Sequence, residues 1–250
     1  MNKIFTTEKE LGIYPTLDGI IHHESDIYIK DEKTLYKVLL YGNRLTREST
    51  IQKLSLYGNS NCVTPSGIIY TPEYQFIGFE MPYLKSYIPS TRLIFSNKIS
   101  YKDKLRFAKK IAIAIEQLYK DGIVFWDIHP DNNMISKNGD IKIVDMDSVR
   151  FSDCYTRDEF QHEIACSHRL LSQLTLSYIS KMNVIELSKL LSEDEIREIF
   201  SFVFKGYLFE YLESVFGFSD EIIFPSEFLE DIKEEDLICV REQLMKKLSK

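Results

Sequence analysis

Alternating apolar and polar positions in the first hundred residues predict β-strands. Residues 26–30 read DIYIK and residues 34–40 read TLYKVLL, and the charged triplet DEK separates these two runs. Both are rich in β-branched and aromatic side chains, so their spacing is typical of a β-hairpin. Two further runs, GIIYT at 67–71 and QFIGFEM at 75–81, predict another pair of strands joined by a turn that contains Pro72.

Helical spacing occurs once among these strands and then dominates the chain. Residues 44–58, RLTRESTIQKLSLYG, have helical character, and Gly58 is the expected C-terminal cap. In residues 101–122 apolar side chains recur at steps of three and four, which predicts an amphipathic helix closed by Gly122. The apolar positions of this helix are Leu105, Ala108, Ile111, Ala112, Ile115, Leu118 and Tyr119.

The remainder of the chain is also predicted to be mainly helical. Residues 158–176 continue the helical pattern, and SEDE at 192–195 is typical of a helix N-cap with an acidic first turn. The connector MPYLKSYIPS contains Pro82 and Pro89, which are unsuited to a central strand. We therefore predict an α+β fold of two parts: a β-rich part with one helix at residues 1–84, and a helical part at residues 85–250.

Composition and charge narrow the classes of function. The 250 residues are 44% hydrophobic, which is enough for a sizeable core, and 31 basic against 38 acidic residues give a net charge of −7. An acidic and evenly mixed surface argues against binding to nucleic acid or to an anionic membrane. The four cysteines are far apart and show no metal-binding spacing. They are expected to be reduced thiols of a cytoplasmic protein.

No apolar segment indicates secretion or membrane insertion. The N-terminal residues MNKIFTTEKELG lack the apolar stretch of a signal peptide, and no run has the length of a transmembrane helix. We therefore expect a cytoplasmic chain, in a compartment where ATP and magnesium are abundant.

The candidate chemistry lies between Gly122 and Ser148. Here a short apolar run leads into DIHPDNN, then come MIS, the turn KNGD and the run IKIVD. Asn-Gly flanked by apolar residues is a strong hairpin signal. The hairpin brings Asp145, at the end of its second strand, near Asn132, which lies just before its first strand.

Oxygen atoms placed in this way suit Mg²⁺, which takes one or two side-chain ligands and completes its shell with phosphates and water. Asn132 and Asp145 are therefore the candidate metal ligands, and Asp127 on the same loop is the candidate base for a substrate hydroxyl. Lys37, in the middle of a predicted strand, is available to contact phosphates. Glu48 on the following helix is its candidate carboxylate partner.

These residues resemble the motifs of the protein-kinase-like superfamily, whose catalytic loop is H-R-D-L-x-x-x-N and whose metal turn is D-F-G. In this sequence Asp127-Ile128 is followed by Asn132 at the same offset, and Asp145-Met146-Asp147 stands at the metal turn. The resemblance implies a bilobal kinase fold with Asp127 as catalytic base. It implies ATP and Mg²⁺ as cofactors.

The resemblance extends into the predicted β-rich part. LYKV around Lys37 is similar to the strand that carries the phosphate-contacting lysine, and Glu48 is similar to its helix partner. GFEMPYL at 78–84 resembles the hinge whose backbone meets the adenine. Glu80 and Met81 are therefore the expected nucleotide contacts in that hinge.

Several motifs depart from the protein-kinase pattern. The glycine-rich loop is reduced to Gly19, so side chains would replace backbone amides at the phosphates. His22, His23 and Ser25 are candidates, and a solvated turn is the alternative for the two histidines. Trp126 replaces the arginine of the catalytic loop, which argues against switching by phosphorylation of an activation segment.

Two departures concern the substrate. The sequence D-x-H-P-x-N, with His129, resembles the aminoglycoside and small-molecule branch of the superfamily, and no Ala-Pro-Glu follows DMDS. His129 is a candidate contact to the γ-phosphate or substrate, with a loop-stabilising hydrogen bond as the alternative. Asp158 resembles the residue that starts the central helix and braces the catalytic loop. The aromatic segment 202–218 is interpreted as a packed helix or a partner surface.

Three hypotheses of function remain open. The first is an ATP- and Mg²⁺-dependent kinase acting on a protein Ser/Thr hydroxyl, because Lys37, Asp127, Asn132 and Asp145 are all present. The second is a small-molecule kinase of aminoglycoside-phosphotransferase type. The third is a nucleotide-binding pseudokinase or interaction module. Each implies ATP as a ligand, and the first two imply a protein or small-molecule hydroxyl acceptor.

Overall fold

The computed structural model describes residues 2–17, 24–94, 96 and 98–152, and at the C-terminal end 191–192, 194–195, 197–198, 233, 235, 239, 242–243 and 246–247. Contacts between Cα atoms divide the chain into two units. Unit 1 comprises Met1–Tyr87 and Lys142–Phe151, and unit 2 comprises Ile88–Ile141 and Ser152–Lys250. The predicted division at 84/85 is a single boundary. It therefore does not include the return of Lys142–Phe151 to unit 1.

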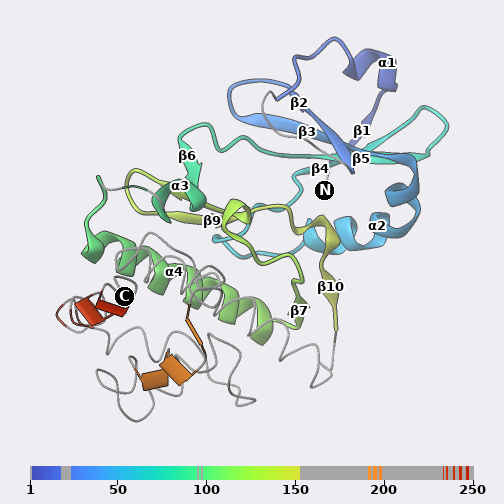
Figure 1. Ribbon diagram of the computed structural model, residues 1–250. Helices are drawn as coiled ribbons and strands as arrows, with labels where there is room; N and C mark the ends of the chain where they lie inside the picture. The colour runs from blue at the N-terminus through green and yellow to red at the C-terminus, as the bar shows by residue number, and fades with distance from the viewer. Residues whose placement is uncertain are drawn as a thin grey trace. The chain divides into compact units, whose positions relative to one another are not determined.

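Unit 1 contains a five-stranded sheet with the strand order β1-β4-β5-β3-β2 (Figure 1). Its strands are β1 (Asn2–Phe5), β2 (Ser25–Ile29), β3 (Thr34–Leu39), β4 (Gly67–Tyr70) and β5 (Phe76–Pro82). β1 runs parallel to β4, whereas the other neighbours are antiparallel. The four strands predicted from alternation are confirmed to within two residues at each end, and β1 is an addition.

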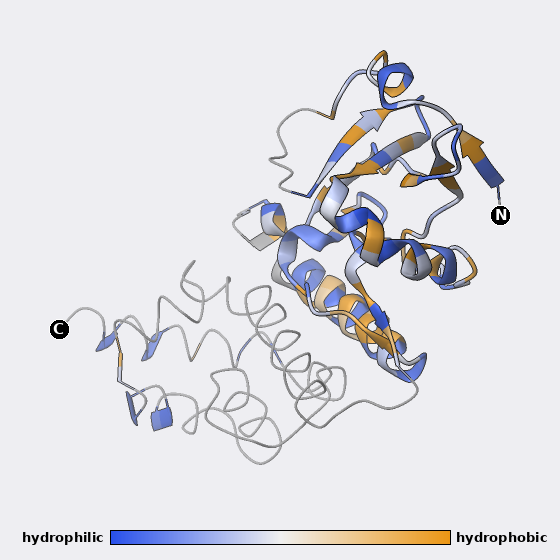
Figure 2. Ribbon diagram, turned by 90° about the vertical axis from the view of Figure 1, so that its right-hand side faces the viewer, coloured by the Kyte–Doolittle hydropathy of each residue, from blue (hydrophilic) through white to orange (hydrophobic). Residues whose placement is uncertain are grey.

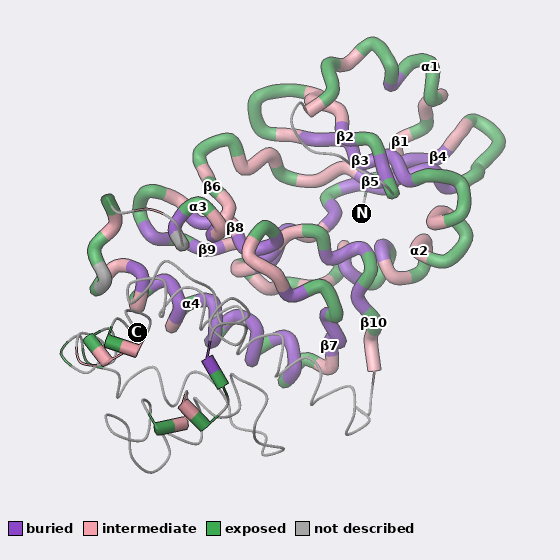
Figure 3. Tube along the Cα trace, viewed as in Figure 1, coloured by how far each residue is buried: buried purple, intermediate pink, exposed green. Residues whose placement is uncertain are grey.

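Side-chain alternation along the strands builds a core on each face of the sheet. Tyr36 and Val38 of β3 pack with Leu11 of the short helix α1 (Glu8–Leu11). Leu39, on the opposite face, packs with Ile51 of α2 (Tyr41–Leu54). Figure 3 shows β3, β4 and β5 largely buried. Because successive strand residues point to opposite faces, Lys37 shares the α2 face with Leu39.

The helix α2 differs at both ends from its prediction. It begins at Tyr41, ahead of the predicted Arg44, and its C-cap is Ser55. The cap at Gly58 is therefore wrong. Ser55 stays in the right-handed region, and its hydroxyl donates to the carbonyl of Gln52 at 2.7 Å. Carbonyl groups of the last turn of α2 thus accept hydrogen bonds from Ser55, ahead of Gly58.

Unit 2 is organised around α4 (Tyr101–Lys120), where apolar and polar residues alternate in Figure 2. The predicted periodicity is confirmed, since all the predicted apolar positions are buried apart from the half-buried Leu105. Ser100 caps the helix by accepting from the amide of Asp103 at 3.1 Å. At the other end Gly122 has φ +71°, and its carbonyl accepts from the amide of Ser152 at 2.8 Å.

The remaining elements of unit 2 are short. They are α3 (Thr91–Ile94), β7 (Ile123–Val124), the 3₁₀ helix η1 (Pro130–Asn132) and β8 (Asn133–Ser136), while β6 (Tyr87–Pro89) and β9 (Ile141–Ile143) lie across the unit boundary. The predicted Asn-Gly turn is confirmed. Gly139 has φ +80°, and the amide of Ser136 donates to the carbonyl of Asp140 at 2.9 Å.

Some predictions near the C-terminus can be compared with the structure and others fall outside it. The N-cap at 192–195 is confirmed, because Ser192 accepts from the amide of Glu195 while the Glu195 carboxylate accepts from the amide of Ser192. The helix at 158–176 with Asp158, and the aromatic segment 202–218, lie outside the described residues. None of the described helices has the length and apolar character needed to cross a membrane.

Candidate active site

Lys37 is a buried cation of unit 1. Its side chain is 7% exposed, and its ammonium group forms ion pairs with Asp145 and, at 2.5 Å, with Asp147. The nitrogen also lies 5.9 Å from the centre of the Phe79 ring, the residue paired with it across β5. Lys37 is therefore held by residues more than a hundred positions away in sequence.

The turn after β9 separates two carboxylates that are two residues apart. Asp145 adopts the left-handed conformation (φ 60°, ψ 39°), and the 3₁₀ helix η2 (Met146–Ser148) follows. Asp tolerates this conformation better than most residues because its short side chain bonds locally. As a result the Asp147 side chain is 2% exposed, whereas the Asp145 side chain remains 45% exposed.

The electrostatics assign different properties to these two carboxylates. Burial alone would raise the pKa of Asp147, but the cations of Lys37 and Arg47 outweigh it and hold that pKa below its ordinary value. Burial, together with the nearby Asp147, raises the pKa of Asp145 despite the opposing effect of Lys37. Burial would lower the pKa of Lys37, but the two carboxylates keep it above its ordinary value. Lys37 and Asp147 are thus a charged pair at neutral pH.

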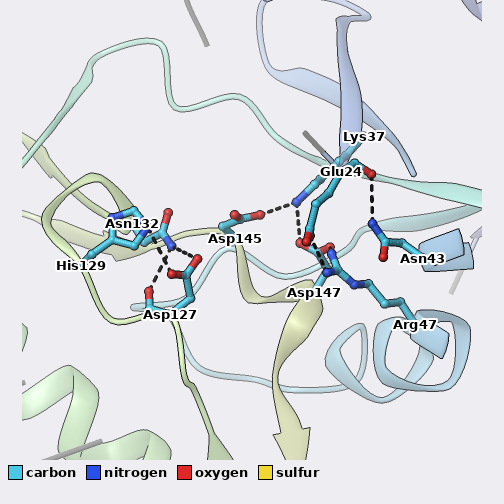
Figure 4. A network of polar contacts seen from close by, with 9 residues as sticks. All are labelled: Glu24, Lys37, Asn43, Arg47, Asp127, His129, Asn132, Asp145 and Asp147. Carbon is cyan, nitrogen blue, oxygen red and sulfur yellow. Dashed lines mark hydrogen bonds and ion pairs between the residues drawn. The ribbon is translucent and has the colours of Figure 1, made fainter. Parts of the chain in front are cut away.

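The helix α2 supplies a second cation to Asp147. Arg47 donates to Asp147 and to Glu24, both at 2.5 Å, and Figure 4 shows its guanidinium group next to these carboxylates. Burial would lower the pKa of Arg47, but Asp147 and Glu24 raise it. Glu48, the expected partner of Lys37, instead accepts from the Tyr70 hydroxyl at 3.0 Å and from Gln52 at 3.2 Å.

In unit 2 the candidate base Asp127 is oriented by Asn132. The Asn132 amide donates to the Asp127 carboxylate at 2.8 Å and to the Asp127 backbone carbonyl at 3.0 Å (Figure 4). Asn132 is buried at the end of η1, while the Asp127 side chain is 49% exposed. One carboxylate oxygen is thereby fixed, and the other lies 3.4 Å from His129 Nε2.

The backbone around this loop is held by side chains of neighbouring segments. Asn133 donates to the carbonyl of His129 at 2.8 Å, and the Ser90 hydroxyl donates to the carbonyl of Pro130 at 2.7 Å. His129 Nδ1 accepts from the amide of Asp131 at 3.3 Å, which is the loop-stabilising bond considered as an alternative role. Thr91 also donates to the Asp131 carboxylate. The loop therefore presents Asp127 from a braced backbone.

Of the residues expected to contact the nucleotide, those of the hinge and Ser25 are described in the structure, and the others are not. Glu80 and Met81 lie within β5, and Glu80 is bonded to Lys30 at 2.6 Å and to Ser66 at 2.9 Å. Its carbonyl accepts from the amide of Ser66. Ser25 is a buried residue of β2. Gly19, His22 and His23 lie outside the described residues.

The candidate metal ligands suit an Mg²⁺ ion that takes most of its coordinating oxygens from bound phosphates and water. Among the described residues no three His, Cys, Asp or Glu side chains gather in a way that could hold a metal ion. Mg²⁺ commonly uses one or two protein oxygens and takes the rest from phosphates and water. The half-exposed Asp145 carboxylate, in unit 1, fits that use, as does the Asn132 amide oxygen in unit 2. Their proximity to each other stays a prediction.

Sequence reasoning missed Arg47 and the burial of Asp147. A signal for Arg47 was present, because Arg44, Arg47, Ile51 and Leu54 recur at steps of three, four and three. Such residues share one stripe of a helix. Ile51 and Leu54 are buried, so Arg47 lies on the stripe that faces the protein.

Comparison with known families adds independent evidence. A family model described as the protein kinase domain matches residues 27–168, which is more than half of the chain. The matched region contains Lys37, Asp127, Asn132 and Asp145.

Proposed function

This chain belongs to the protein kinase domain family, and from that premise we propose that it transfers the γ-phosphate of ATP, with Mg²⁺, to a hydroxyl group, with a protein serine or threonine as the first candidate acceptor. Lys37, Asp127, Asn132 and Asp145 would perform this reaction. The observation that carries the proposal is the bond from Asn132 to Asp127, which fixes one carboxylate oxygen while leaving the side chain half exposed.

Asp127 is the proposed base. A carboxylate that accepts a bond on one oxygen retains lone pairs on the other, so it can accept the proton of an acceptor hydroxyl. The hydroxyl oxygen then bonds to the γ-phosphorus as the bond to the ADP oxygen breaks. The braced backbone of residues 129–133 supports this role because positioning contributes strongly to phosphoryl transfer.

Lys37 is the proposed contact to the nucleotide phosphates. Its raised pKa keeps it cationic, and its burial on the α2 face of the sheet fixes its position. Asp145 and Asn132 are the proposed Mg²⁺ ligands. The bound ion would neutralise charge on the transferring phosphate. Glu80 and Met81 are the proposed adenine contacts, through their backbone groups in β5.

A small-molecule acceptor is the second candidate. It is favoured by His129, whose Nε2 lies 3.4 Å from the Asp127 carboxylate and whose ring is partly exposed. A side chain in this position is suited to contacting a compact substrate beside the base. The sequence D-x-H-P-x-N and the lack of Ala-Pro-Glu after the metal turn agree with this acceptor class.

Transfer of labelled γ-phosphate from ATP tests the proposal. The purified chain, with magnesium and a cell lysate, is expected to label an acceptor, and Asp127→Asn is expected to reduce the rate by about 10²–10⁴-fold because the base is lost. Asp131→Asn is the matched control, since Asp131 is an exposed carboxylate on the same loop that accepts from Thr91. It should retain most of the activity.

Separation of the lysate after the reaction identifies the acceptor class. Label in protein that depends on Asp127 supports a protein kinase, whereas label in the small-molecule fraction supports the second candidate. ATP binding without any transfer would contradict both and favour a nucleotide-binding pseudokinase. Equal loss of activity in Asp127→Asn and Asp131→Asn would contradict the assignment of Asp127 as base.

A further inference from the structure

The helix α2 offers two oppositely charged side chains at adjacent positions, Arg47 and Glu48. Adjacent residues of an α-helix point about 100° apart, so they cannot both face the same partner. In this structure Arg47 is directed at Asp147, and Glu48 is directed at Tyr70 on β4 (Figure 4 shows the former). The side chain of α2 that reaches the Lys37 cluster is therefore a cation.

Asp147 connects this cation to Lys37. One of its carboxylate oxygens accepts from Lys37 and the other from Arg47, both at 2.5 Å. With a side chain 2% exposed, it is the most buried carboxylate of the cluster. Removing one partner of a buried ion pair leaves an uncompensated charge, which is strongly unfavourable. The three side chains consequently restrain one another.

The two carboxylates that contact Lys37 also differ in their exposure to solvent. Asp145 is half exposed, and it is the proposed Mg²⁺ ligand, so its carboxylate has a second task. Asp147 is enclosed by Lys37 and Arg47 and has no comparable exposure. A lysine that must contact phosphates while a neighbouring carboxylate binds a metal needs a separate counter-ion to hold its position.

We propose that Asp147 is the positioning residue of Lys37 and that Arg47 of α2 holds Asp147 in place, so that α2 is coupled to the phosphate-contacting lysine through the relay Arg47–Asp147–Lys37 and not through Glu48. The inference rests on the proposed function of Lys37 as a nucleotide contact. It assigns to the second aspartate of Asp-Met-Asp a task distinct from that of Asp145.

A comparison of two arginines on the same helix tests the relay. Arg47→Met removes the bond to Asp147. Arg44→Met removes an arginine of nearly equal exposure, 17% against 15%, whose partners are Glu8 and the carbonyl of Leu39. With ATP and MgCl₂ as probes, Arg47→Met is expected to raise the Kd for ATP about tenfold, and Arg44→Met and Glu48→Gln less than about twofold.

Kinetics separate positioning from a general loss of structure. With the labelled acceptor fraction, Arg47→Met should raise KM for ATP more than it lowers kcat, and Arg47→Lys should restore part of the affinity because it keeps the charge. Equal effects of Arg44→Met and Arg47→Met on the Kd would overturn the inference. A tenfold effect of Glu48→Gln with none for Arg47→Met would do so as well.

A measurement without nucleotide keeps the relay testable if the wild type does not bind ATP. The urea midpoints of Arg47→Met, Asp147→Asn and the double variant form a double-mutant cycle. The double variant is expected to unfold at a urea concentration no lower than that of the less stable single variant. A loss of stability equal to the sum of the two single losses would refute the coupling. If the wild type fails to bind ATP, the proposed function fails while this cycle still reports on the relay.

Discussion

At two glycine positions, the backbone conformation and the surrounding atoms determine whether a side chain can be accommodated. Gly122 ends α4 with φ +71°, and a Cβ atom there would lie 2.7 Å from the carbonyl oxygen of Ser152. Both the backbone conformation and the space therefore require glycine. Gly42, within α2, has no heavy atom within 4 Å of such a Cβ position among the described residues, apart from its chain neighbours and the adjacent helix backbone.

These two glycines give a matched prediction. Gly122→Ala should lower the free energy of unfolding by about 2 kcal/mol, because the left-handed conformation and the contact with Ser152 both oppose a side chain. Gly42→Ala should raise it by up to about 1 kcal/mol through helix propensity. Chemical denaturation of both variants measures the difference. A neutral Gly122→Ala would contradict the geometry.

Residue-scale chemistry was only partly predictable from sequence. Asp127, Asn132, Asp145 and Lys37 were selected because their types and offsets suit phosphoryl transfer. The residue of α2 that contacts Asp147 is not identified by residue type and offset alone. Arg47 and Glu48 are neighbours, and which of them faces Asp147 depends on the rotation of α2 that buries Ile51 and Leu54.

At the scale of elements, local patterns predicted α4 and the hairpin around Gly139 well, because both are specified by short-range periodicity and turn chemistry. β1 was missed because Asn2–Phe5 is a short edge strand with little burial, and its parallel pairing with β4 is a long-range contact. The capping box Thr7-x-x-Glu10 that starts α1 was a readable signal that the prediction overlooked.

The helix α4 offers a test of its buried stripe with two isoleucines. Ile111 is fully buried, whereas Ile113 is 58% exposed. Ile111→Ala is expected to lower the free energy of unfolding by about 2–4 kcal/mol, through lost burial and the cavity left behind. Ile113→Ala should change it by less than about 0.5 kcal/mol. Thermal or urea unfolding distinguishes them, and similar losses would show that the assigned face of α4 is wrong.

At the scale of the whole molecule, unit 1 is assembled from two distant segments. Lys37 in the first segment pairs with Asp145 and Asp147 in the second, across 108 and 110 positions of sequence. Sequence patterns could not predict this closure, because each segment reads locally as a strand or turn. The predicted boundary at 84/85 is a single cut, whereas unit 1 also contains residues 142–151.

This closure predicts unequal costs for two lysines. Lys37→Met should lower the free energy of unfolding by roughly 3 kcal/mol, since it leaves the Asp147 carboxylate buried beside only Arg47. Lys30→Met, which breaks a more exposed pair with Glu80, should cost less than about 1 kcal/mol. Denaturant titration of the full chain measures both. Equal losses would indicate that the Lys37 cluster does not stabilise the unit.

The discontinuity of unit 1 also has a consequence during protein synthesis. A ribosome adds about 5–20 residues per second, so Lys37 precedes Asp145 by roughly 5–20 s. Throughout that interval the nascent sheet carries a lysine on its α2 face before either aspartate exists. The N-terminal segment therefore cannot reach its final structure in the order of its own translation, and its completion must wait for the turn at residues 145–148.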